Sequence, residues 1–165
     1  MFKEINATEI KDNIINLIAN EWALVAAGTE QDYNMMTASW GFMGEMWGQD
    51  CVATVVRPQR YTMDYINNND YFTFSFYGDN KAIHSVCGKY SGRDVNKTEK
   101  ANLTPIFNYN SVYFAEARLV IVCKKQYVSQ LEEKGFLNKE ILEKWYNNDL
   151  HNLIIGKIEK VLIKE

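Results

Sequence analysis

The chain has 165 residues, of which 47% are hydrophobic and 24% are charged, and its formal net charge is −3. That length suits one domain with a real core, and the mildly acidic balance argues against a nucleic-acid binder. No apolar run is long enough to span a membrane and no signal peptide begins the chain, so we expect a cytoplasmic protein. The three cysteines form no CxxC pair, which predicts neither a disulfide framework nor a zinc site.

The first third of the chain alternates short apolar runs with polar breaks. Apolar residues at helical spacing over residues 10–18 predict an amphipathic helix that begins near Thr8. The apolar runs at 22–27 and 35–40 predict two strands joined by a polar turn. Three glycines in the following ten residues predict a loop at 41–50.

The rest of the chain is rich in β-branched and aromatic runs. Residues 51–56 predict a strand that Pro58 ends, because proline cannot donate to a strand ladder, and residues 61–66 predict a short helix. The strongest strand signal is YFTFSFY at 71–77. Further helices are expected at 80–86, 96–103 and 137–146, with a strand or hairpin at 111–124 and a strand at 153–163. Strands with short helices between them, and no regular βαβ alternation, predict a mainly β barrel with peripheral helices.

Two arginines stand directly before the predicted helix at 61–66, in the segment RPQRYT. Free backbone N–H groups at a helix start favour an anion, and arginine binds phosphate through paired donors. Arg57 and Arg60 therefore predict a phosphate site, with the Thr62 hydroxyl and Lys97 as further donors. The alternative is that both arginines are solvated turn residues.

A second segment, NMMTASWG, places short polar side chains beside a broad ring. In a strand, Thr37 and Ser39 face the same way and offer donors and acceptors next to Trp40. An aromatic heterocycle with polar edges would fit there. The alternatives are that the hydroxyls belong to plain strand residues and that Trp40 lies in the core or at a dimer interface.

Four segments taken together, WALVAAGTEQDYNMMTASWG, CVATVVRPQRYT, YFTFSFYG and SGRD, carry a family resemblance. In order and spacing they resemble the flavin reductase-like, FMN-binding split-barrel family, and its flavoredoxin-like branch most closely. The matching stretch covers residues 22–97. The late segment DLHNLIIGKI also resembles the family's D-H-x-I-I-G-E motif. Here, however, Leu150 separates Asp149 from His151, and Lys157 stands where glutamate is frequent.

The resemblance implies a fold, a cofactor and a set of site residues. The fold is a Greek-key split β-barrel of the FMN-binding type with short peripheral helices, one domain over residues 1–165, assembled as a homodimer with FMN near the interface. The residues implied to line the isoalloxazine and ribityl chain are Asn34, Thr37, Ala38, Ser39 and Trp40. Those implied at the phosphate end are Arg57, Arg60, Tyr61, Thr62 and Lys97. His151 is a candidate near the flavin ring or a nicotinamide, or else a surface histidine before a strand, and His84 has no matching role and reads as an ordinary helix residue.

Three functions remain open from the sequence. The first is an oxidoreductase that moves electrons between NADH or NADPH and flavin, with the chemistry supplied by the cofactor. The second is a flavoredoxin-type protein that keeps FMN and passes electrons to a protein partner. The third is a non-catalytic module that binds another ligand, such as haem, on the same fold. The chain has no GxGxxG motif, so a nicotinamide nucleotide would not bind on a Rossmann unit.

Overall fold

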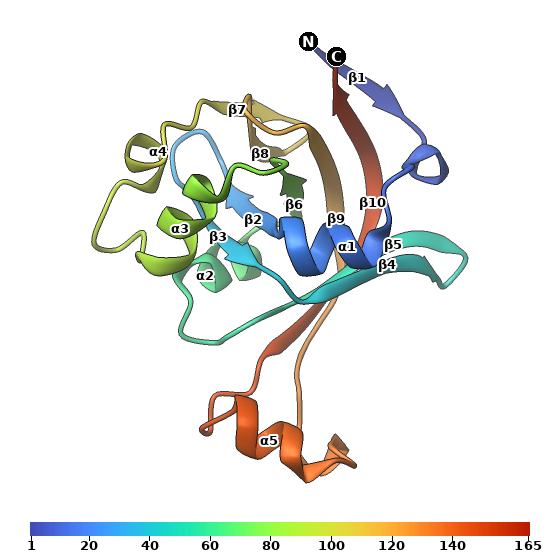
Figure 1. Ribbon diagram of the computed structural model, residues 1–165, viewed down its shortest axis with the longest axis vertical. Coiled ribbons are helices and arrows are strands. Elements are labelled where there is room, and N and C mark those ends of the chain that lie inside the picture. Colours follow the sequence, from blue (N-terminus) through green and yellow to red (C-terminus); the bar gives the residue numbers. More distant parts are fainter.

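Eight strands form one antiparallel sheet in the computed structural model, which describes residues 1–165 (Figure 1). The order in the sheet is β3 (Tyr33–Ala38), β2 (Ala23–Gly28), β6 (Tyr71–Phe76), β9 (Leu119–Gln130), β10 (Asn152–Lys164), β5 (Gln49–Val56) and β4 (Gly41–Met46). The eighth strand, β1 (Phe2–Ile5), also pairs with β10, and β7 (Pro105–Asn108) and β8 (Ser111–Phe114) form a separate hairpin. The helices are α1 (Ile14–Asn16), α2 (Tyr61–Asn68), α3 (Lys81–Lys89), α4 (Lys97–Lys100) and α5 (Lys139–Trp145). The predicted mainly β fold with short peripheral helices is confirmed.

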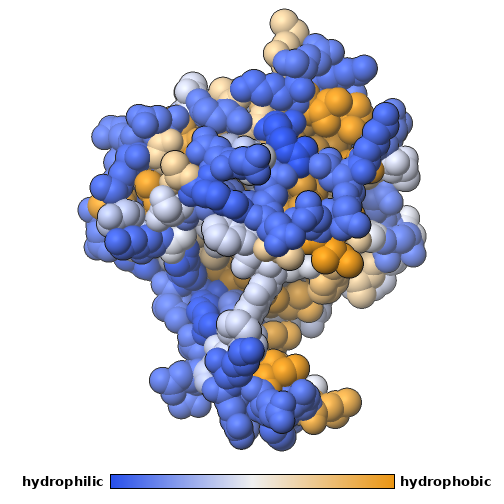
Figure 2. Space-filling model, viewed as in Figure 1, coloured by the Kyte–Doolittle hydropathy of each residue, from blue (hydrophilic) through white to orange (hydrophobic).

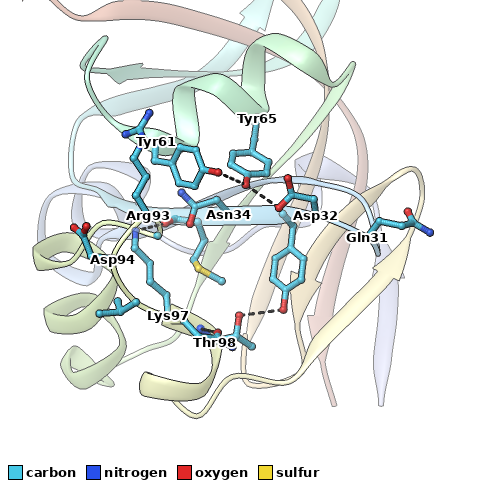
Figure 3. A pocket seen from close by; sticks show the side chains of 14 residues that line it. Gln31, Asp32, Asn34, Tyr61, Tyr65, Arg93, Asp94, Lys97 and Thr98 are labelled. Atoms are coloured by element: carbon cyan, nitrogen blue, oxygen red, sulfur yellow. Dashed lines mark hydrogen bonds between the residues drawn. The ribbon is translucent and has the colours of Figure 1, made fainter.

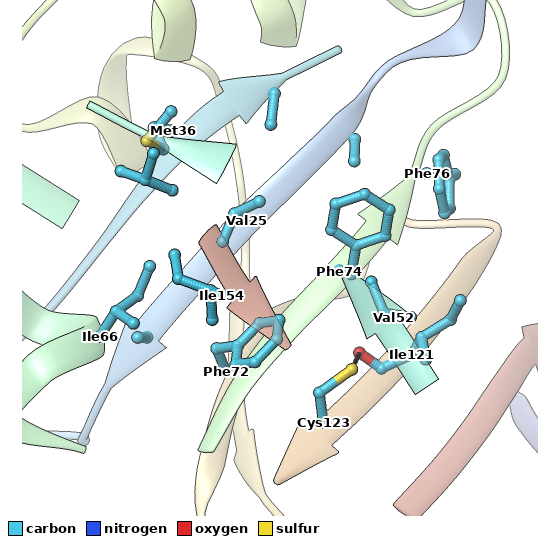
Figure 4. Close-up of a cluster of buried hydrophobic side chains, with 14 of the residues drawn as sticks. Val25, Met36, Val52, Ile66, Phe72, Phe74, Phe76, Ile121, Cys123 and Ile154 are labelled. Carbon is cyan, nitrogen blue, oxygen red and sulfur yellow. Dashed lines mark hydrogen bonds between the residues drawn. The ribbon is translucent and has the colours of Figure 1, made fainter. Parts of the chain in front are cut away.

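Both faces of the central strands are buried, which explains why β2 reads as a continuous apolar run. Val25 belongs to a core cluster that includes three phenylalanines of β6, and Figure 4 shows this cluster. Leu24 faces the other way, into a second cluster that includes Ile83 and Cys87 of α3. Successive side chains of a strand point to opposite faces, so β2 has no polar face to present to water.

Two predicted elements in the first third of the chain differ from the structure. The expected helix at 10–18 is helical only from Ile14, where the single turn α1 runs into a π-helical turn at Leu17–Glu21, and a separate 3-10 turn lies at Ala7–Glu9. The expected loop at 41–50 is instead the hairpin of β4 and β5. Its turn lies at Trp47 and Gly48, which adopt φ of 59° and 70°. Gly41 and Gly44 lie within β4, because pairing with β5 outweighs the low strand propensity of glycine.

The predicted strand or hairpin at 111–124 divides between the two sheets. β8 pairs with β7, whereas β9 lies between β6 and β10 in the large sheet. The break falls at the turn in which the Ala117 N–H donates to the carbonyl of Phe114. The predicted helix at 96–103 is also shorter, since α4 ends at Lys100.

β9 and β10 continue beyond the rest of the sheet and carry α5 at their far end (Figure 1). We call residues 131–151 the arm. Leu137 and Ile141 of the arm are exposed, and Figure 2 shows hydrophobic surface over α5 on a face that is otherwise mostly hydrophilic. No helix in the structure combines the length and the apolar character needed to cross a membrane.

Candidate functional site

A cavity of about 300 Å³ lies where β3, the start of α2 and the arm meet, and we call it the Trp40 cavity. It is lined by Met36, Thr37, Ala38, Ser39, Trp40, Val55, Arg57, Arg60, Gly88, Trp145 and His151. Seven of these are residues that the sequence analysis selected. The NMMTASWG segment and the RPQRYT segment therefore converge on one site, although the hairpin of β4 and β5 separates them in the chain.

Arg60 links the start of α2 to the end of α3. It is the residue that precedes the first turn of α2, and its guanidinium donates to the carbonyls of Gly88, at 3.1 Å, and Cys87, at 3.3 Å. The last carbonyls of a helix have no partner within it, so this contact satisfies groups that would otherwise be orphaned. Burial lowers the pKa of Arg60 from its ordinary value. The guanidinium is held beside the cavity in a partly desolvated position, where a bound anion would stabilise its positive charge.

Lys97 is buried against the same helix end. Its ammonium donates to the carbonyls of Met35, at 2.6 Å, and Cys87, at 3.3 Å. Burial lowers the pKa of Lys97 to about 8. The Cys87 carbonyl thus accepts from both Lys97 and Arg60, and the Lys97 side chain is used within the fold and does not line the Trp40 cavity.

Lys97 instead lines a second pocket of about 490 Å³, which we call the Lys97 pocket (Figure 3). Asn34 and Tyr61 also line it, so three of the predicted site residues lie here and not in the Trp40 cavity. Arg93 of the SGRD segment contributes a further cation, stacked 4.2 Å from the centre of the Tyr61 ring and paired with Asp64 at 2.8 Å.

Thr62 lines neither of these two cavities. It is buried, and its hydroxyl accepts a hydrogen bond of 3.1 Å from the Asn34 side chain. The Asn34 side chain oxygen in turn lies against Gly92, where a Cβ would come within 2.4 Å. The glycine of SGRD is therefore required by close packing on Asn34, and these three residues fix the position of β3 relative to α2.

Arg57 anchors the arm over the Trp40 cavity. It forms an ion pair with Asp149 and donates to the Trp145 carbonyl at 2.9 Å. Through this anchor the Trp145 ring reaches Trp40, with ring centroids 5.1 Å apart in an edge-on arrangement. The guanidinium predicted at the phosphate end is thus engaged by the arm in this structure.

His151 lies at the base of the arm beside Trp40, with ring centroids 5.2 Å apart, and only 7% of it is exposed. Its Nδ1 is 3.0 Å from the Tyr146 hydroxyl. Burial, with a smaller effect of Arg57, lowers the pKa of His151 to about 4, so the ring is neutral at pH 7. The interpretation of His151 as a surface histidine is therefore wrong, since the ring is buried and lines the Trp40 cavity, and its place near a flavin ring or a nicotinamide stays a prediction.

The docking of the arm is expected to weaken in acid. The Asn147 N–H, the Gln59 amide and Arg57 lower the pKa of Asp149 from 3.8 to about 2. A carboxylate with a lowered pKa stabilises the folded state above its unfolded pKa, and this contribution is lost as pH falls through the folded value. We expect Asp149→Asn to melt at a lower temperature than the wild type at pH 7, with the difference shrinking between pH 3.8 and 2. A difference that stays constant over that range would show that the Asp149 charge has no part in docking.

The sequence analysis missed four contributors to the Trp40 cavity, of which Met36 lies within the NMMTASWG segment itself. Gly88 lies on α3 and Trp145 lies in the arm, so both are far from the two motifs in the chain. Val55 lies in the apolar strand β5, and nothing in its type or neighbours indicates a binding site. An aromatic residue a few positions before the DLHNLIIGKI segment was the one signal that could have indicated Trp145. Gly88 gave no local signal, because its role depends on the approach of β3, where a Cβ would lie 3.4 Å from that of Thr37.

Comparison with solved structures finds proteins with the same fold at low sequence identity. An FMN-binding domain of a flavin reductases-like enzyme from Shewanella baltica shares 13% identity, with a TM-score of 0.70 over 99% of this chain and 77% of the other. Flavoredoxin of Desulfovibrio vulgaris shares 20% identity, with a TM-score of 0.69 over 98% and 78%. An NADH:FAD oxidoreductase from Streptomyces globisporus shares 11% identity, with a TM-score of 0.65 over 87% and 75%.

No curated protein matches the chain in a sequence search. The model of the family described as flavin reductase like domain, however, matches residues 15–165. That match includes both site motifs and the arm, and the similar structures share the overall fold. The chain therefore belongs to the flavin reductase-like domain family, and its mainly β fold is the split barrel of that family.

Proposed function

We propose that this protein binds FMN in the Trp40 cavity and moves electrons between NADH or NADPH and the flavin. The observation that carries the proposal is the meeting of an aromatic, hydroxyl-lined wall with a partly buried arginine at one helix start. Family membership and the flavin-binding descriptions of similar structures support it. The donor nucleotide is proposed by analogy with the NADH-dependent similar structure.

The donors and acceptors of the cavity suit a flavin mononucleotide. Trp40 offers a ring face, Thr37 and Ser39 offer hydroxyls, and Arg60 stands before the free N–H groups of α2. A planar ring with polar edges would lie along β3, and a phosphate would lie towards α2. Helix starts and arginine suit an anion and would not favour a neutral ligand of similar size.

When bound, FMN would supply the electron transfer chemistry, and the chain's own residues would bind and orient it. The arm places Trp145 and His151 beside Trp40, which limits access of water to that wall of the cavity. Since His151 is neutral at pH 7, it adds no charge beside the ring. Arg60 compensates the charge of the phosphate.

The test is the absorption spectrum of the protein as purified or after addition of FMN, followed by NADH and then NADPH without air. A flavin spectrum that bleaches with either nucleotide supports the proposal. A flavin spectrum that neither nucleotide bleaches, with reduction by a protein donor, supports the flavoredoxin-type alternative. Absence of flavin binding together with a haem spectrum would contradict the proposal.

Trp40 gives a direct optical check of the proposed ring position. We expect Trp40→Leu to weaken FMN binding by about 0.5–1.5 kcal/mol, because the aromatic contact is lost. We also expect the remaining bound flavin to fluoresce more strongly, since an indole in contact quenches it. Titration of FMN with emission and melting measured in parallel tests both effects.

The control is Tyr127→Leu, which removes an exposed aromatic ring from β9, away from the Trp40 cavity. It should leave the flavin emission and affinity unchanged. If Trp40→Leu lowers the melting temperature while affinity and emission stay at wild-type values, Trp40 is a core residue and the ring lies elsewhere.

We also propose that the chain forms a homodimer. The edge strand β4 and its turn expose Phe42, Met46 and Trp47, which are 59%, 41% and 55% accessible. Exposed aromatic side chains on an open strand edge favour a protein contact. Light scattering at micromolar concentration should give twice the chain mass, and a monomer mass would contradict this.

A further inference from the structure

His84 is a buried histidine with one bonded and one unbonded nitrogen. It lies on α3 and is 2% exposed, and its ring packs edge-on against Trp22 and Tyr77. Nδ1 is 3.0 Å from the Thr37 hydroxyl, whereas Nε2 is buried without a partner. Burial, with a smaller effect of Lys81, lowers the pKa of His84 to about 4, so the ring is neutral at pH 7. An unbonded buried nitrogen is costly, which suggests that the bonded one has a specific task.

That task concerns Thr37, which lines the Trp40 cavity from β3. The Thr37 hydroxyl lies within reach of two groups of the same residue, Nδ1 of His84 at 3.0 Å and its carbonyl at 3.3 Å. A threonine hydroxyl has one proton to donate and two lone pairs to accept with. The direction of these bonds therefore decides what the hydroxyl can offer to a ligand.

A neutral imidazole has two tautomers, and both lead to the same result. If Nδ1 carries the proton, it donates to the Thr37 oxygen, and the Thr37 proton goes to the His84 carbonyl. If Nε2 carries the proton, Nδ1 accepts the Thr37 proton. In both cases His84 takes the only proton of the hydroxyl, and lone pairs are all that remain for the cavity.

We propose that His84 is a positioning residue that fixes the Thr37 hydroxyl as a hydrogen-bond acceptor towards the Trp40 cavity. The wall at this point then selects a ligand that brings an N–H or O–H donor and disfavours one that brings a bare acceptor. The identity of that ligand rests on the proposed function, whereas the direction of the Thr37 hydrogen bond does not.

An oxidised flavin has two kinds of hydrogen-bond donor that could meet the Thr37 oxygen. The isoalloxazine ring has a single N–H, on its imide nitrogen, and its other polar edge atoms are acceptors. The ribityl chain adds hydroxyl donors. FMN and its N3-methyl derivative separate the two sources, because methylation removes the imide N–H and leaves the ribityl hydroxyls.

The variants His84→Asn and His84→Gln form a matched pair. Both lose the aromatic ring, but an asparagine amide reaches the place of Nδ1, and a glutamine amide reaches the place of the unpartnered Nε2. We expect Thr37→Val and His84→Gln each to raise the dissociation constant of FMN about fivefold, and His84→Asn to stay close to the wild type. Melting curves of all three show that the variants compared are folded.

A second measurement needs no flavin binding. In proton NMR of the protein as purified, the Thr37 hydroxyl proton should exchange slowly with water in the wild type and in His84→Asn, and rapidly in His84→Gln. Slow exchange in a wild type that fails to bind FMN would support the direction of the Thr37 bond and contradict the proposed function. Rapid exchange in the wild type, or equal FMN affinities of His84→Asn and His84→Gln, would overturn the inference.

N3-methyl-FMN then identifies the donor. If the imide N–H meets Thr37, methylation weakens binding to the wild type and has no further effect on Thr37→Val. If a ribityl hydroxyl meets Thr37, methylation leaves the ratio of wild-type to Thr37→Val affinities unchanged. A wild type that binds FMN no better than Thr37→Val would contradict any hydrogen bond from a ligand to this hydroxyl.

Discussion

Arg60→Ala should raise the dissociation constant of FMN roughly ten- to 150-fold, which corresponds to a loss of about 1.5–3 kcal/mol. The guanidinium is partly buried beside the first turn of α2, so its interaction with a phosphate would be screened less than on the surface. Riboflavin lacks the phosphate and should lose much less. Parallel titrations of FMN and riboflavin by fluorescence measure the difference.

Arg60 also holds the end of α3, so its removal affects the fold as well. Lys3→Ala is a charge-matched control, because it removes one positive charge from the exposed strand β1. It should change neither affinity. If Arg60→Ala weakens FMN and riboflavin equally, the arginine acts on the cavity through the Cys87 and Gly88 carbonyls, and the phosphate lies elsewhere.

Gly156→Ala should lower the free energy of unfolding by about 1–3 kcal/mol, because the core has no room for a methyl group there. An added Cβ would lie 2.6 Å from the Phe72 ring and 2.8 Å from the Cβ of Cys123. Phe72 is 1% exposed and part of the main core cluster, so its ring cannot move aside into solvent. Urea denaturation of the wild type and the variant measures the change.

The second variant, Phe72→Leu, removes part of the ring that fills this space. Residues in direct contact are not additive, so the double variant should be more stable than the sum of the two single changes predicts. Gly44→Ala is the control, since a Cβ there has no heavy atom within 4 Å. Additive losses in the double variant would show that Gly156 is needed for its backbone conformation and not for the space it leaves.

Local patterns predicted much of the fold. YFTFSFY forms β6, and the strand after residue 50 ends before Pro58 as expected. β1 was missed because FKEI carries a weak strand signal, and it exists through its pairing with β10. The glycines of β4 predict a loop when only neighbouring residues are considered. The segment is a strand because it pairs with β5.

In the candidate site, too, contacts within one segment could be predicted and contacts between distant segments could not. Thr37, Ser39 and Trp40 lie together because they are neighbours on one segment, which the sequence shows directly. Separation of Lys97 from that cavity could not be predicted, because it depends on the Cys87 carbonyl that α3 presents. The hydrogen bond between His84 and Thr37 could not be predicted either, because the two residues are 47 positions apart in the chain.

The position of β10 in the sheet has a consequence for how the chain acquires its structure. In the strand order β9-β10-β5-β4, the β4–β5 hairpin is joined to the rest of the sheet through β10 alone. Val56 and Asn152, which pair in this junction, are 96 residues apart. Such distant pairings make folding slow, because the entropy of closing a long loop is lost before the contact is gained. Until β10 is synthesised and docks, the hairpin has an unpaired strand edge, and during this interval the nascent chain is most exposed to aggregation.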